Sequence, residues 1–74
     1  MTQLDRIISG IDTIENALTL KSSYSDEIND LDQIASDLSV MRYIGAPRWK
    51  INDAISRINQ IKKWMRDEEA AAQW

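Results

Sequence analysis

Apolar residues recur every three or four positions along most of the chain, which is the spacing of amphipathic helices. The first such stretch, residues 3–20, has its apolar positions at Leu4, Ile7, Ile8, Ile11, Ile14 and Leu18. The second stretch, residues 26–43, has them at Ile28, Leu31, Ile34, Ala35, Leu38 and Met41. The third, residues 47–71, has them at Ile51, Ala54, Ile55, Ile58, Ile61 and Met65. No useful length of sequence alternates with period two, so the pattern predicts helices and no strands.

Two interruptions separate the helical stretches. The first is the polar segment 21–25, and the second is Gly45-Ala46-Pro47. Glycine favours the left-handed residue just past a helix end, and proline favours the first residue of the next helix. The second turn is short, so the helices beside it run antiparallel. Each apolar stripe is wide enough to cover two neighbours, which predicts an all-α fold: a single domain, residues 1–74, forming a three-helix bundle built on an antiparallel helical hairpin.

Local signals mark the helix ends. Thr2 followed by Asp5 resembles an N-terminal cap of the first helix, and Ser23 or Ser25 can cap the second. Gly10 lies inside the first helix, where glycine costs about 1 kcal/mol relative to alanine. It is either a site of close helix contact or a weak point in that helix.

Charge is divided unevenly along the chain behind a formal net charge of −3. Residues 1–46 hold eight acids and three bases, a net charge of −5, whereas residues 47–74 hold four acids and six bases, a net charge of +2. In an antiparallel hairpin, heptad register places Asp37 opposite Lys50 and Asp30 opposite Arg57. The same register places Trp64 near Tyr24.

Composition argues against catalysis. The chain has no histidine, no cysteine and only two glycines, so it lacks the commonest general base, a thiolate nucleophile and a phosphate-binding loop. We interpret the acids of the second helix as a solvated face and not as a calcium site, because they lack the turn glycine of a calcium loop. We therefore expect no enzyme activity, no metal and no cofactor.

Size and surface chemistry favour self-association. A chain of 74 residues buries only about 60% of its unfolded surface, and oligomerisation is a natural remedy.

The acidic balance argues against nucleic acid, and no apolar run approaches the roughly 18 residues of a membrane span. The N-terminus lacks the pattern of a signal peptide, so we expect a cytoplasmic location. Small acidic chains without catalytic groups are typical of accessory proteins of phages or mobile elements.

Several large apolar residues lie off the stripes or at helix ends, and three tryptophans in 74 residues are more than such a core requires. Tryptophan is favoured at interface hot spots. Our leading hypothesis is a non-catalytic protein that forms homo-oligomers and binds another protein, as an inhibitor or adaptor. Its candidate interface residues are Val40, Ile44, Trp49, Trp64 and Trp74.

The segment around the second turn suggests an alternative. Cations and aromatic rings alternate there, which is chemistry that suits a nucleotide or another phosphorylated anion. The candidate ligand-binding residues are Arg42, Tyr43, Arg48, Trp49 and Lys50. The sequence leaves open the identity of partner or ligand, the subunit number, and whether the first helix packs in its own chain or is exchanged between chains.

Overall fold

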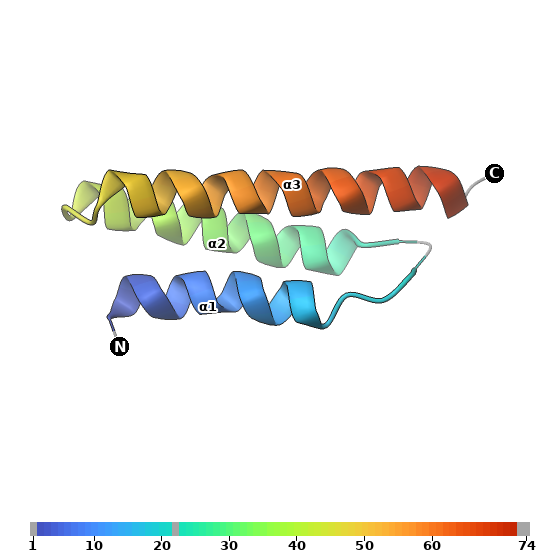
Figure 1. Cartoon of the computed structure of the whole chain (residues 1–74), viewed down its shortest axis with the longest axis horizontal. Coiled ribbons are helices and arrows are strands. Elements are labelled where there is room, and N and C mark those ends of the chain that lie inside the picture. Colours follow the sequence, from blue (N-terminus) through green and yellow to red (C-terminus); the bar gives the residue numbers. More distant parts are fainter. Residues whose placement is uncertain (1, 22, 73–74) are drawn as a thin grey trace.

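The computed structural model describes residues 2–21 and 23–72 and consists of three helices. They are α1 (Gln3–Asn16), α2 (Ser25–Tyr43) and α3 (Arg48–Ala72). The helices run up, down and up in a rod of 45 × 18 × 16 Å, and the described residues contain no strand (Figure 1). The predicted all-α three-helix class is confirmed. Helix α1 packs against α2 and α3 of its own chain.

The core follows the predicted stripes. In α3 the buried residues are spaced by three and four positions, as in a heptad seam. They are Ile51, Ala54, Ile58, Ile61 and Met65. Helix α2 contributes Leu31, Leu38 and Met41, and α1 contributes Leu4 and Ile11. The flanking stripe residues, such as Ile34 and Ile55, are half-buried against this core.

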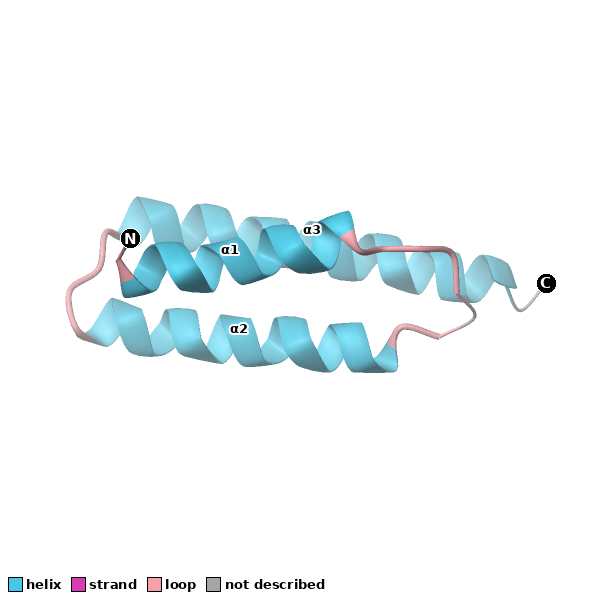
Figure 2. Ribbon diagram, turned by 90° about the horizontal axis from the view of Figure 1, so that it is seen from below, coloured by secondary structure: helices cyan, strands magenta, loops and turns pink. Residues whose placement is uncertain are grey.

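Helix α1 ends at Asn16 and not at residue 20 as predicted. Beyond it, residues 17–21 are non-helical and begin the long loop that leads to α2 (Figure 2). Tyr24, at the end of this loop, is fully buried. The Tyr24 hydroxyl donates a hydrogen bond to the Thr19 carbonyl at 2.8 Å and accepts one from the Lys21 amide at 3.0 Å. Residues 17–20 are non-helical, so these local contacts with Tyr24 take the place of the helix that their apolar pattern predicted.

The helix caps match the prediction at α1 and differ at α2. The Thr2 hydroxyl accepts a hydrogen bond from the Asp5 amide at 3.2 Å, and the pKa of Asp5 lies below its usual value chiefly because of hydrogen bonding to Thr2. At α2 the residue in the cap position is Tyr24, which makes no side-chain cap. Its amide instead donates to the Glu69 carboxylate of α3 at 2.6 Å. The Ser23 hydroxyl accepts a long hydrogen bond, 3.5 Å, from the Ser25 amide and shares one of 3.0 Å with the Ser25 hydroxyl.

The turn between α2 and α3 has the predicted glycine geometry. Gly45 has φ = 92°, in the left-handed region. The Ala46 amide donates to the Met41 carbonyl at 3.1 Å and the Gly45 amide to the Arg42 carbonyl at 3.4 Å, which is the Schellman pattern of helix termination. Helix α3 begins at Arg48, one residue after Pro47 and one residue later than predicted.

Gly10 is a site of close contact between α1 and α2. A Cβ atom at this position would lie 3.3 Å from Cδ1 of Ile34. This supports the close-contact interpretation of that glycine.

The predicted ion pairs of the hairpin are wrong. Arg57 contacts α1 and not Asp30: its Nη2 atom lies 2.5 Å from Asp12 and 3.0 Å from Glu15. Among the residues that the structure describes, Asp37 forms no ion pair with Lys50. The ion pair that does join α2 to α3 is Asp32–Lys62, at 2.6 Å.

The error has a geometric cause. In α3, Lys50, Arg57 and Trp64 are spaced by seven residues and therefore form one row along the helix. This row flanks α1, whereas the row on the other side of the α3 seam, which includes Lys62 and Glu69, reaches α2 and its N-terminus. The apolar stripe fixes which face of α3 points inward. It does not fix on which side of that face each neighbour lies.

Candidate functional site

The end of α2 carries three exposed apolar side chains on one face. Val40 is 59% exposed, Tyr43 is 93% exposed and Ile44, the residue that caps α2, is 67% exposed. Residues three and four positions apart on a helix are neighbours, so the three side chains form one surface. We call Val40, Tyr43 and Ile44 the tip patch. Met41, in the same turn, points into the core instead.

Cations flank the tip patch without acidic partners from the same segment. Residues 38–52 include Arg42, Arg48 and Lys50 and no acid. None of these three bases forms an ion pair with any described residue. An open groove of about 550 Å³ is lined by Ser39, Arg42, Tyr43 and Arg48. We call it the tip groove; its side chains combine two guanidinium groups, a hydroxyl and a phenol ring.

The five candidate ligand residues are therefore only partly brought together. Arg42, Tyr43 and Arg48 line the tip groove, whereas Trp49 and Lys50 line a different depression, which α3 forms with α1. There the Lys50 ammonium lies 5.6 Å from the centre of the Trp49 ring, close enough for a cation–π contact.

A groove follows the boundary between α1 and α3. Its first part, about 290 Å³, is lined by residues that include Ile8, Trp49 and Ala54. Its second part, about 350 Å³, is lined by residues that include Leu18 and Trp64. Arg57 lines both parts, so they adjoin each other. The second part lies at the end of α1, because Glu15 is in the last turn of that helix and Leu18 follows it.

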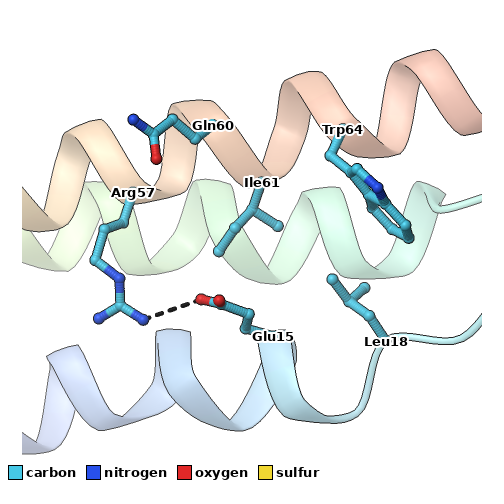
Figure 3. Close-up of a pocket in the computed structure, with 6 residues that line it drawn as sticks. All are labelled: Glu15, Leu18, Arg57, Gln60, Ile61 and Trp64. Carbon is cyan, nitrogen blue, oxygen red and sulfur yellow. Dashed lines mark hydrogen bonds and ion pairs between the residues drawn. The ribbon is translucent and has the colours of Figure 1, made fainter.

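Figure 3 shows how the second part is built. Ile61 of α3 lies between a polar side and an apolar side. On the polar side Arg57 reaches down to Glu15 of α1, and this hydrogen bond and the one to Asp12 raise the pKa of the guanidinium. On the apolar side the Trp64 indole points toward Leu18.

Trp64 lies beside Tyr24, as predicted. The two ring centroids are 5.7 Å apart and the ring planes are tilted by 59°, which is a favourable aromatic geometry. The indole nevertheless remains 39% exposed. Core packing thus accounts for one part of this side chain, and the other part lines the groove.

The candidate interface residues also separate into two groups. Val40 and Ile44 belong to the tip patch, together with Tyr43, which the sequence had suggested for ligand binding only. Trp49 and Trp64 lie in the two parts of the α1–α3 groove, about 22 Å apart along α3 at 1.5 Å per residue. Trp74 lies outside the described residues. The contribution of Ile8, Leu18 and Glu15 was not predicted, because it depends on which side of α3 the first helix lies.

The described residues form neither a metal-binding cluster nor a membrane-spanning helix. In residues 2–21 and 23–72, no group of three or more His, Cys, Asp or Glu side chains is placed to hold a metal ion. Within the same residues, no helix combines the length and apolar character needed to cross a membrane.

The structure thus defines an all-α three-helix bundle with an apolar, cation-flanked tip and a tryptophan-lined groove between two helices. No protein-family model, curated protein or solved structure matches the chain.

Proposed function

We propose that the protein is a non-catalytic binding module that self-associates and uses its tip patch to bind another protein, as an inhibitor or adaptor. One observation carries this proposal: Val40, Tyr43 and Ile44 are 59%, 93% and 67% exposed on one helical face. A core that already buries Leu38 and Met41 gains nothing from these three side chains. Clustered apolar exposure of this kind is a feature of interaction surfaces.

The charge around the patch describes the partner. Arg42 and Arg48 have no ion-pair partner among the described residues, so an apolar partner surface with acidic residues at its rim would complement them. A protein fits this description better than a nucleic acid, because the chain carries a net charge of −3 and the patch itself is apolar. A cytoplasmic location and an origin in a phage or mobile element stay predictions.

The test compares matched variants in a capture experiment. Ile44→Asp places a charge in the tip patch, and Ser36→Asp places the same charge at an exposed position two turns earlier on α2. A partner that the wild type and Ser36→Asp capture equally and Ile44→Asp loses supports the proposal. With the purified partner, we expect Ile44→Asp to raise Kd by about tenfold or more, as at an interface hot spot. If all three proteins capture the same set, the tip patch is not the binding surface.

The tip groove favours a second candidate function, the binding of a nucleotide or another phosphorylated anion. Its lining includes the guanidinium groups of Arg42 and Arg48, the Ser39 hydroxyl and the Tyr43 ring, and it includes no carboxylate. Guanidinium pairs bind phosphate oxygens, and an aromatic ring can stack on a base. This function would use the same end of the molecule as the tip patch.

Thermal unfolding with ATP, GTP or inorganic phosphate tests this second function. A ligand at 100 times its Kd stabilises the folded state by about 2.7 kcal/mol, which raises the Tm of so small a domain by about 10–20 °C. We expect Arg48→Ala to abolish the shift and Lys63→Ala, at an exposed position elsewhere on α3, to keep it. The absence of a shift with every probe would eliminate the nucleotide function.

A further inference from the structure

A second row of side chains follows α3 on its surface, outside the core seam. Its members are spaced by three and four residues in strict alternation, which is the spacing of a helix-packing seam. They are Lys50, Asp53, Arg57, Gln60, Trp64 and Asp67, all of them half-buried or exposed. We call this row the outer seam. It flanks the α1–α3 groove, because three of its members line the first part of the groove and three line the second.

The charges of the outer seam are self-complementary in one direction only. If a second α3 packs antiparallel about the point between residues 58 and 59, Lys50 meets the partner's Asp67. In the same register Arg57 meets the partner's Gln60, and Lys63, beside the seam, approaches the partner's Asp53. A parallel pairing would instead place each charge against its own copy. Charge complementarity therefore selects an antiparallel arrangement with two-fold symmetry.

The register that pairs these charges also brings Trp64 to an apolar depression on the second copy. It places Trp64 opposite the partner's Asp53, which lines the 290 Å³ part of the partner's α1–α3 groove. The walls of that part include the apolar side chains of Ile8 and Ala54 and the ring of Trp49. The exposed part of the Trp64 indole, 39% of the residue, thus faces an apolar depression on the second copy, and two-fold symmetry repeats the contact.

We infer that the protein forms an antiparallel homodimer through the outer seams of two α3 helices, with the exposed edge of each Trp64 indole facing the partner's α1–α3 groove. The inference rests on the proposed function, since it gives the self-association a surface and a register. It also places the two tip patches at opposite ends of the dimer, about 35 Å apart along the axis at 1.5 Å per residue. A dimer of this form presents two binding tips and leaves both uncovered.

Charge reversal tests the pairing. Asp53 and Lys63 are both exposed, so reversing either charge leaves the packing of the monomer in place. By sedimentation equilibrium, we expect Asp53→Lys and Lys63→Asp each to raise the dimer Kd by about tenfold or more, and the double variant to return within about threefold of the wild type. The control is Arg6→Asp, an exposed position of α1 outside the groove lining, which changes the net charge as much as Lys63→Asp does.

A distance measurement tests the direction of the helices independently. The chain has no cysteine, so Ala70→Cys gives a unique site for a spin label at an exposed position of α3. The proposed register places the two labels about 35 Å apart along the axis, whereas parallel packing places them within roughly the 8–10 Å between helix axes plus the label arms.

The outcomes separate cleanly. A wild type that stays monomeric at high micromolar concentration, single reversals that leave Kd unchanged, or a short label distance each overturns the dimer. Single reversals that weaken the dimer without rescue by the double variant overturn the register. Ile44→Asp lies outside the outer seam and leaves the dimer Kd unchanged, so a failure of the tip patch to bind a partner is seen separately.

Discussion

Replacing Tyr24 by phenylalanine tests what holds the loop between α1 and α2. The variant keeps the buried ring and its contact with Trp64 and removes one oxygen atom. That oxygen donates to the Thr19 carbonyl at 2.8 Å and accepts from the Lys21 amide at 3.0 Å. The hydroxyl thus joins two parts of the loop to a residue that is itself 0% exposed.

The expected loss follows from these two hydrogen bonds. Each contributes about 0.5–1.5 kcal/mol to stability, and the ring burial does not change. Thr19 and Lys21 are exposed residues, so their freed backbone groups turn to water and the penalty for unpaired buried groups stays small. We therefore expect Tyr24→Phe to lower the free energy of unfolding by about 1–3 kcal/mol.

Urea unfolding followed by circular dichroism measures this loss. For a domain of this size the urea m-value is about 1 kcal/mol/M, so the midpoint should fall by about 1–3 M with an unchanged slope. Tyr43→Phe is the matched control, because the chain has two tyrosines and this one is 93% exposed. We expect it to change stability by less than about 0.5 kcal/mol. Equal midpoints for the two variants would refute the role of the Tyr24 hydroxyl.

Three further substitutions probe other contacts. Glu69→Ala removes the carboxylate that accepts a hydrogen bond from the Tyr24 amide at 2.6 Å. It should lower the free energy of unfolding by about 1.5–3 kcal/mol in urea, whereas the control Glu68→Ala should lower it by less than about 0.5 kcal/mol. Gly10→Ala should stabilise by about 0.5–1 kcal/mol, because the terminal methyl of Ile34, 3.3 Å from the new Cβ, can give way; destabilisation would show that it cannot. The pKa of Glu27 is lowered chiefly by its hydrogen bond from the Lys21 ammonium. The stability that this ion pair contributes is present above the unfolded pKa of about 4.3 and is lost as pH falls through the lower folded pKa. Glu27→Gln should therefore flatten the decline of Tm below pH 5, and an unchanged decline would contradict this role of Glu27.

The core could be predicted from the sequence because burial follows helical periodicity. Every buried residue except Tyr24 lies on a predicted stripe. Tyr24 was assigned to a polar interruption, and its burial depends on a hydroxyl satisfied by the loop around it. Periodicity carries no information about such contacts. The early end of α1 has the same origin, since Thr19 must leave the helix to reach that hydroxyl.

The ion pairs could not be predicted because they depend on the handedness of the bundle. A stripe defines which face of α3 is buried, but α1 and α2 can exchange sides without changing any stripe. Arg57 was assigned to α2 by heptad register, and in the structure it contacts Asp12 and Glu15 of α1. The choice of side also decides which residues line the α1–α3 groove. The sequence could therefore suggest Trp49 and Trp64 but not the contribution of Ile8, Glu15 and Leu18.

The exposed apolar side chains of the tip patch and of the α1–α3 groove lie at two separate places on the molecule. Their separation suggests two different binding functions. A sequence that specifies its fold well departs from local rules mainly at functional positions. Here the helix signals, the turn glycine and the core spacing all agree, yet Tyr43 and Trp49 stay 93% and 65% exposed. The tip patch lies at one end of the rod and can meet a partner without covering the groove. The groove runs beside α3 from Trp49 to Trp64 and can meet a second copy without covering the tip. Because the two surfaces do not compete, self-association and partner binding can occur together, and substitutions at one should leave the affinity at the other unchanged.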